Sequence, residues 1–569
     1  MAPLPIHTLP TSAPMQENSQ ASPPNPAQAS SQLSVLVVDP NPGMRASLQN
    51  MLTQAGISKI EFATSAGTAI RQLARRSYDV VLCEYDLGPG PGQEGQDGQH
   101  LLEDLRQHRL LSNQSIFILL TSEATYGKVV SAAELAPTDY VLKPFTVEVL
   151  SRRIERALDR RAALAAVHGL VDEGNLREAL RLCGSPQARA SRHAADFARQ
   201  AAELQVALGD LEGAVAQYQA ILAERPRGWA TLGLARTMVR QGRHAEAAAL
   251  LDDLVTSNPR LMAAYDLLAH CHAALGAPQR AQRVLQDALS ISPHLVGRLR
   301  KLGEIALEAG DVAVAEKSFR QVVARGRLSE FRDPEDHFNL VRALVRKGEA
   351  AQCGGVIRDL EKSLRESRGV DACKAYSNAL VLEAAGEKEA AGAALSDAVR
   401  AAVEASALSA RLKIGLARSC LHHQIDDGAA AVVLSMMTAD GGGLSAEEAV
   451  AIFARAGRAD LADGIGKQLG QQAQDLIGVA AEQTRGGDYK GAVQTMLEAR
   501  VKSPGSLPVT VATASAILRQ IDALGWDHHL GERAAGLIDA TRKLDAGEAQ
   551  VKALQEMYAK VRRKYGIAN

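Results

Sequence analysis

The sequence of 569 residues has few aromatic side chains, few cysteines and no excess of either charge. Aromatic residues make up 4% of the chain, which favours helices packed through small side chains over β-sandwiches or barrels. The formal net charge of −1 gives no overall attraction to nucleic acid or to anionic lipid, so neither partner is expected. The only two tryptophans, Trp229 and Trp526, are interpreted as core residues. A chain of this length is longer than a single hydrophobic core usually supports, so two or more domains are expected.

Cysteine pairing and membrane segments are also lacking. No two cysteines form a CxxC or CxxH pattern, and no run approaches the roughly 18 apolar residues that a membrane span needs. The N-terminus has no basic region followed by an apolar one, which argues against a secretion signal. We therefore expect reduced thiols, a cytoplasmic location and no membrane insertion. The six cysteines are Cys83, Cys183, Cys271, Cys353, Cys373 and Cys420.

The first 150 residues divide into two parts. Residues 1–32 are rich in Pro, Ser, Gln and Ala and hold too little apolar surface to offset the entropy of ordering, so a disordered leader is predicted. Residues 33–150 alternate short β-branched runs with helical patterns, which predicts a doubly wound α/β domain with five parallel strands. The runs are SVLVVD, KIEFAT, DVVLCE, SIFILLT and YVLK.

The segment after Pro144 reads as one unbroken helical pattern up to Gly169. Residues 151–168 are therefore predicted to be a connecting helix. A helical connection is semi-rigid, so a movement at one end of the helix can be transmitted to the other end.

From about residue 165 the sequence repeats itself, with a Gly followed five residues later by an Ala. Gly209, Gly242, Gly276 and Gly310 lie 33, 34 and 34 residues apart. A Gly ends one helix in a left-handed conformation, and small residues let the paired helices approach closely. This pattern resembles the tetratricopeptide repeat, clearest over 195–327 and looser over the rest of 169–440. Residues 441–569 are predicted to be further helical repeats and a C-terminal cap, after a break at the run DGGGL.

Four polar residues stand at the carboxyl ends of predicted strands, where open α/β sheets bind ligands. They are Asp39, Glu84, Thr121 and Lys143. This set resembles the response-regulator receiver family, with which the segments VVDPNPGMR, LLTSE and YVLKPFT match. The resemblance covers about residues 33–150 and implies a flavodoxin-like fold in a phosphorelay protein.

The resemblance also shows where this sequence departs from the family. Glu84 stands at the position of the phosphoacceptor aspartate, and Pro40 replaces the second carboxylate of the family's acidic pair. Phosphoryl transfer at such a site needs Mg²⁺ held by carboxylates. Asp39, Glu84 and Asp86 are left as candidate ligands, so only a weak Mg²⁺ site is expected. Tyr140 matches the family's switch aromatic, although it also fits ordinary strand packing.

Three interpretations of Glu84 remain open. Its longer side chain places a carboxylate near Thr121 and Lys143, which would hold the domain in a permanently active-like state. Alternatively, Glu84 only forms an ion pair with Lys143 in a docking domain, or phosphorylation still occurs by some route. Asp86 is the only nearby alternative acceptor, and it lies two residues on, in the loop. The long glycine-rich stretch that follows lacks a nucleotide-binding motif and is expected to be a flexible loop.

The resemblance of the repeats implies that a superhelix binds other proteins on its concave face. No catalytic constellation is recognised, so the expected function is a non-catalytic signalling adaptor of the two-component type, a pseudo-receiver coupled to a protein-binding array. The implied partners are proteins bound by the array and a histidine kinase; self-association is left open. The rival is a phosphorylation-independent assembly scaffold with an inert docking domain. A nucleic-acid-binding regulator lacks any helix-turn-helix signal or basic face.

Overall fold

A computed structural model provides the structure of the protein. Residues 1–31 of the predicted leader, the glycine-rich loop at 89–96 and the break at 438–445 lie outside the described residues. The described ranges are 32–88, 97–112, 114–122, 138–225, 227–293, 295–327, 332–365, 367–405, 408–437, 446–455, 457–502, 506–543 and 548–567.

Five parallel strands form one sheet in the order β2-β1-β3-β4-β5. Every residue of β3 and β4 is buried, which accounts for their continuous apolar runs, because a parallel sheet is covered on both faces. The strands are β1 (Ser34–Val38), β2 (Lys59–Ala63), β3 (Val80–Glu84), β4 (Ile116–Thr121) and β5 (Asp139–Leu142).

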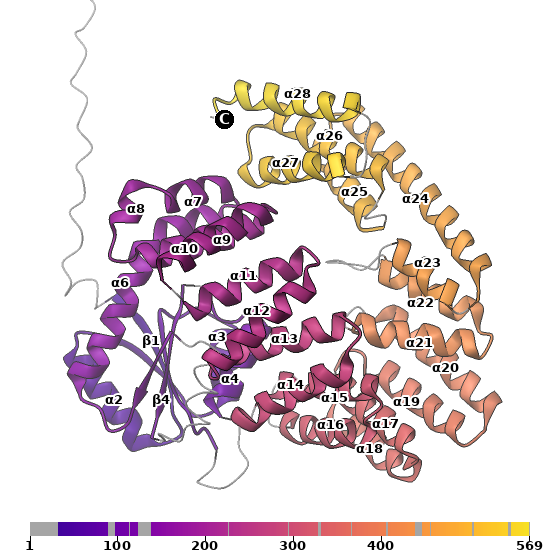
Figure 1. The fold of residues 1–569 in the computed structure, drawn as a ribbon, viewed down its shortest axis with the longest axis horizontal. Helices are drawn as coiled ribbons and strands as arrows, with labels where there is room; N and C mark the ends of the chain where they lie inside the picture. The colour runs from indigo at the N-terminus through magenta and orange to yellow at the C-terminus, as the bar shows by residue number, and fades with distance from the viewer. Residues whose placement is uncertain are drawn as a thin grey trace, which may run out of the picture.

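Helices cover both faces of this sheet (Figure 1). On one face Leu48, Leu52, Leu150 and Ile154 join the apolar side chains of the central strands in one core. The other face is covered by leucines and alanines of two further helices. The first pair is α2 (Pro42–Gln54) and α6 (Val147–Asp172), and the second is α3 (Ala66–Leu73) and α4 (Gly98–Gln107). The predicted doubly wound five-stranded fold is confirmed.

Helix α6 joins the sheet domain to the array without a break. It begins four residues before the predicted 151 and continues through Gly169 to Asp172. Gly169 does not adopt the left-handed backbone of the glycines that end helices, so it lies inside α6 instead of ending it. Near its start α6 packs on the sheet, whereas Leu164 and Val167 near its end belong to the core of the first helical pair.

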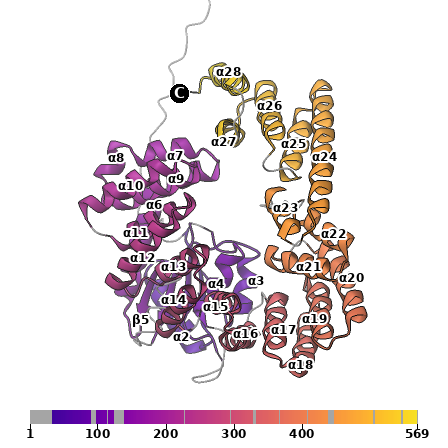
Figure 2. The same cartoon turned by 45° about the vertical axis from the view of Figure 1, so that its right-hand side comes forward.

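The rest of the chain is helical, and successive helices pack as pairs (Figures 1 and 2). The first half contains α7 (Leu176–Cys183), α8 (Pro186–Ala190), α9 (Ala194–Ala207), α10 (Leu211–Glu224), α11 (Gly228–Arg240), α12 (His244–Ser257), α13 (Met262–Ala274), α14 (Pro278–Ile291), α15 (Val296–Ala309), α16 (Val312–Gly326) and α17 (Pro334–Lys347). The second half contains α18 (Ala350–Ser363), α19 (Val370–Ala384), α20 (Lys388–Glu404), α21 (Ala410–His422), α22 (Asp426–Met437), α23 (Ala446–Arg455), α24 (Ala459–Arg485), α25 (Tyr489–Lys502), α26 (Leu507–Leu524), α27 (His528–Lys543) and α28 (Glu548–Lys564).

The glycines of the repeat pattern adopt the predicted left-handed backbone. Their φ angles lie between 72° and 84°, a region that side chains with a Cβ rarely adopt. The alanines that follow five residues later, such as Ala247 and Ala281, are fully buried between helices. At Gly303 a Cβ would stand 2.8 Å from the Phe319 ring, so the helices could not approach as closely with a larger residue. The resemblance to tetratricopeptide repeats therefore holds in three dimensions.

The array curves so far that its last helices return to its first. Helix α27 lies beside α7 in both views (Figures 1 and 2), and Arg177 of α7 forms an ion pair with Glu532 of α27 at 3.1 Å. All six cysteines are buried free thiols. Within the described ranges, no helix combines the length and the apolar character that crossing a bilayer requires.

Candidate functional site

The carboxyl edge of the sheet brings together the four polar residues that the sequence singled out. Asp39 directly follows β1, Glu84 ends β3, Thr121 ends β4 and Lys143 directly follows β5. The strand order places β1, β3, β4 and β5 side by side, so these positions share one edge. Asp39, Glu84 and Thr121 are 1%, 8% and 4% exposed, which is rare for such side chains unless they have partners.

Glu84 and Lys143 form the central ion pair of this pocket. The Lys143 ammonium donates to Glu84 Oε2, and the other Glu84 oxygen accepts from the backbone N–H of Asp86 at 3.2 Å. Lys143 Nζ also lies 3.7 Å from Asp39 Oδ2. One cation therefore faces two buried carboxylates, and both oxygens of Glu84 are engaged.

Asp39 is held in place by the start of α2. Its Oδ1 accepts from the Asn41 N–H at 2.8 Å, and Arg45 donates to its backbone carbonyl at 2.6 Å. Asn41 in turn caps α2 with its side-chain oxygen, a common use of Asn before a helix. Asp39 Oδ2 is buried without a hydrogen bond and faces the Lys143 ammonium. Pro40 supplies no carboxylate to this pocket.

Asp86 is not brought together with the other candidates. Its side chain is exposed and accepts from the Gly88 N–H at 3.1 Å, so it lies at the rim, in the loop after β3. The turn there is tight: the Gly98 N–H donates to the Tyr85 carbonyl, and a Cβ on Gly98 would stand 2.5 Å from the Glu84 carbonyl oxygen. The inward direction of Glu84 and the outward direction of Asp86 are set by the backbone of this turn.

These residues do not fit a Mg²⁺ site of ordinary strength. Of the three candidate ligands, Glu84 is occupied by Lys143, Asp86 is exposed, and only Asp39 has an uncommitted oxygen. The described part of the chain contains no group of three His, Cys, Asp or Glu side chains arranged to hold a metal ion. The pKa of the Cys83 thiol is raised well above its ordinary value, first because the thiol is buried. The negative charges of Glu84, Asp97 and Asp39 raise this pKa further.

Tyr140, the expected switch aromatic, lies on β5 and is 39% exposed. It is therefore not turned into the interior beside the buried Thr121. Under the family resemblance, an aromatic side chain packed inward would accompany the active state. The exposed ring does not show that feature.

Two residues that matter for this site escaped the sequence analysis. Arg153 and Arg161 of α6 bind Asp139 and Asp79 at 3.0 Å each and fasten the connecting helix to the sheet. Asp139 opens β5 and Asp79 directly precedes β3. The signal in the sequence was only a helix rich in arginine, which does not reveal which carboxylates the arginines meet.

Comparison with known proteins agrees with the fold of the sheet domain. A profile of the response regulator receiver domain matches residues 35–155. The chemotaxis protein CheY of Pseudomonas aeruginosa is 29% identical over 128 residues, which is 22% of this chain and 98% of that protein. Chemotaxis protein CheY-3 of Vibrio cholerae is 27% identical over the same share of this chain and 93% of its own length.

Solved structures resemble the two parts of the chain separately. A tetratricopeptide repeat protein from Parabacteroides merdae aligns with 45% of this chain and 96% of its own, with a TM-score of 0.31 and 15% identity. A two-component response regulator from Clostridium difficile aligns with 23% of this chain and 98% of its own, with a TM-score of 0.20 and 24% identity.

Proposed function

We propose that this chain, in which a response regulator receiver domain is joined to tetratricopeptide-like repeats, is a non-catalytic signalling adaptor whose receiver pocket is set by Glu84. The coarse part of this function, signalling and protein interaction, follows from the two kinds of domain. The finer part is that Glu84 replaces the phosphoacceptor and that the pocket works without phosphorylation. In this role the protein works in the cytoplasm, and a histidine kinase is a binding partner that transfers no phosphoryl group to it.

The observation that carries the proposal is the ion pair between Glu84 and Lys143. In the receiver family that this pocket resembles, phosphorylation adds negative charge at the end of the third strand, opposite the lysine that follows the fifth. Here a permanent carboxylate already engages that lysine, and it reaches further than an aspartate would. A carboxylate that reaches toward Lys143 is therefore present without phosphorylation, so the proposed state of the pocket does not depend on a kinase.

Weak Mg²⁺ binding belongs to the same proposal. With Pro40 in place of a carboxylate and Lys143 on Glu84, a divalent cation would have to compete with an ammonium group for its ligands. Mg²⁺ prefers octahedral oxygen coordination and dehydrates reluctantly, so it competes poorly for such a site. We expect millimolar Mg²⁺ to change neither the stability nor the partner binding of the protein.

A phosphodonor experiment tests this function. The wild-type protein and Glu84→Asp are incubated with Mg²⁺ and acetyl phosphate, and intact mass is measured, with Asp86→Asn as the control for the rim carboxylate. We expect one added phosphoryl group on Glu84→Asp at most, and none on the wild type. Modification of the wild type that disappears in Asp86→Asn would overturn the proposal, because Asp86 would then be a true acceptor.

The second candidate is an assembly scaffold with an inert receiver-like domain, and the exposure of Tyr140 favours it. The two functions differ in what Glu84→Gln does to partner binding. In the adaptor, loss of the negative charge frees Lys143 and changes the affinity for the partner. In the scaffold, Glu84→Gln and Lys143→Ala leave partner affinity unchanged.

A further inference from the structure

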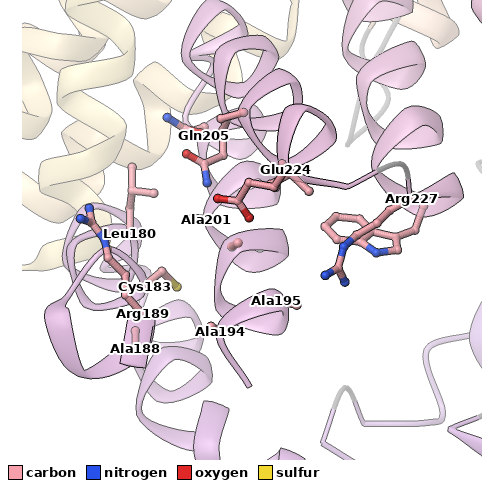
Figure 3. A pocket seen from close by; sticks show the side chains of 16 residues that line it. Leu180, Cys183, Ala188, Arg189, Ala194, Ala195, Ala201, Gln205, Glu224 and Arg227 are labelled. Atoms are coloured by element: carbon pink, nitrogen blue, oxygen red, sulfur yellow. The ribbon is translucent and has the colours of Figure 1, made fainter. Parts of the chain in front are cut away.

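Two hollows lie on either side of the segment that opens α11, next to the helix that leaves the receiver domain. The larger, of about 760 Å³, is bounded by α7, α8, α9 and α10 (Figure 3). The smaller, of about 410 Å³, lies between α6, α9 and α11. Ala195, Arg227 and Trp229 line both, so the two hollows adjoin at these three residues and are together called the double hollow.

The larger hollow has an apolar floor. Successive turns of α9 present Ala194, Ala198 and Ala201 to it, and Leu180 of α7 closes one side. Figure 3 shows Ala194, Ala195 and Ala201 between Leu180 and Arg189 on one side and Arg227 on the other. Small side chains leave room above the helix, so this hollow can accept an apolar side chain from another molecule.

The smaller hollow is basic. Four arginines line it, with one aspartate and one histidine. Arg160 is neutralised by Asp196 at 2.7 Å, and Arg199 by Glu203 at 2.8 Å. The four arginines are Arg156, Arg160, Arg199 and Arg227.

The remaining arginines around the hollows have no acidic partner. In the parts of the chain that are described, the guanidinium groups of Arg156, Arg189 and Arg227 make no ion pair or hydrogen bond. Trp229 lies between the two hollows, half-buried, with the Arg199 guanidinium 5.8 Å from its ring centroid. Arginine charges beside an apolar floor and an aromatic ring are complementary to carboxylates beside an apolar side chain.

We propose that this double hollow binds an acidic peptide segment of a partner protein. An apolar side chain of the segment enters the alanine-lined hollow, and its carboxylates bind Arg156 and Arg227, with Trp229 packed between. This inference rests on one part of the proposed function, that the array binds a protein. It adds the chemical character of the bound segment and the position of its binding site. A nucleic acid fits less well, because the arginines stand beside an apolar floor and the net charge of the whole chain is −1.

The double hollow is connected to the receiver domain through α6. Arg156 and Arg160 are on α6, two and six residues beyond Ile154, which packs against the sheet. A ligand that binds these arginines favours one position of α6, and by reciprocity a receiver state that shifts α6 changes the affinity for the ligand.

Trp229 fluorescence provides the test in the full-length protein. In a Trp526→Phe background, Trp229 is the only tryptophan, and its emission is followed during titration with a short synthetic peptide in which single leucines alternate with pairs of glutamates. We expect saturable binding that weakens as salt is added. Arg156→Glu combined with Arg227→Glu should weaken binding about 10-fold or more, because two charge-assisted contacts become repulsive.

Matched variants and peptides show whether the arginines of the double hollow bind the carboxylates. Arg283→Glu, at an exposed arginine of α14, should leave peptide affinity unchanged. If Arg156→Glu with Arg227→Glu unfolds the chain, the milder Arg156→Gln with Arg227→Gln replaces it in the titration. Equal binding of a peptide with glutamine for glutamate, no binding of the acidic peptide, or tighter binding of oligothymidylate would each overturn the proposal. Peptide affinity that is the same in Glu84→Gln counts against control by the receiver and leaves the acidic-peptide site standing.

Discussion

At the scale of single residues, the pocket depends on one additional methylene group. Glu84 carries the charge of an aspartate but extends further from the end of β3, and Lys143 meets it there. Asp39 faces the same ammonium from β1. Charged groups buried to this extent are tolerated only because they compensate one another.

Removing the lysine should therefore destabilise the receiver domain. Lys143→Met leaves Glu84 and Asp39 buried without a cation, and we expect a loss of about 3 kcal/mol in the free energy of unfolding. Urea denaturation followed by circular dichroism measures it. Adding Glu84→Gln to Lys143→Met should recover part of the loss, and a double variant as unstable as Lys143→Met alone would show that the ion pair is not the cause.

At the scale of elements, α6 is the part of the molecule that both domains share. It is fastened to the sheet by Arg161, which binds Asp79, and Asp79 also accepts two hydrogen bonds from Ser34. Burial raises the pKa of Asp79, but the bonds from Ser34 and the charge of Arg161 outweigh it, so the pKa lies below its ordinary value. The carboxylate is thus stabilised in the folded state.

This shift predicts a dependence on acid. A lowered folded pKa means that the contribution of Asp79 to stability is complete above its unfolded value of about 3.9 and is lost as the pH falls through the lower folded value. We expect the receiver domain to lose stability more steeply below about pH 4 in the wild type than in Asp79→Asn. Thermal unfolding at a series of pH values measures this difference. Equal slopes would exclude Asp79 as the titrating group.

The helical pairs make a second prediction at this scale. Gly310 ends α15 with φ of 83°, so Gly310→Ala should cost the array about 1 kcal/mol or more. Gly355 lies inside α18 with open space around its Cα, and Gly355→Ala should stabilise by up to about 1 kcal/mol through helix propensity. Opposite shifts in the melting temperature of the two variants test the argument. Shifts of the same sign would contradict it.

At the scale of the whole molecule, the array returns to the point where α6 ends. Gly174 follows α6, and a Cβ there would stand 3.0 Å from the Cβ of His529 on α27. Arg177 and Glu532 bridge the same contact, beside a hollow of about 500 Å³. Burial raises the pKa of Glu532, and the nearby charge of Arg177 only partly offsets this effect. Keeping the Glu532 carboxylate charged in this contact therefore costs free energy. Among the described residues, the ion pair of Arg177 with Glu532 is the charged link between α7 and α27, so we expect the contact to depend on it.

Reversing one charge should open this contact. We expect Arg177→Glu to increase the radius of gyration in small-angle X-ray scattering, because it sets two negative charges against each other. Arg177→Glu with Glu532→Arg should restore the closed form. Arg181→Glu is the matched control, since Arg181 forms its ion pair with Glu178 on its own helix. An unchanged radius in Arg177→Glu would mean that the ion pair does not hold the array closed.

The sequence by itself determined the two fold types, the period of the repeats and the four residues at the strand ends. These follow from local rules: continuous apolar runs make buried parallel strands, and glycine and alanine at fixed spacing make closely paired helices. Glu84 and Lys143 were predicted to be neighbours because parallel strands end at one edge of a sheet.

Only the tertiary structure decided the directions of Asp86 and Tyr140, the anchors of α6, the hollows around Trp229 and the contact of α27 with α7. The sequence analysis interpreted Trp229 as a core residue, and its ring does pack against the core of α9, α10 and α11. It also lines the basic hollow, which the sequence did not reveal because the other lining residues come from separate helices. The return of α27 has a similar cause. Each repeat is rotated slightly relative to the one before it, and the curvature of the array is the sum of these rotations. The sequence of a single repeat therefore does not reveal it.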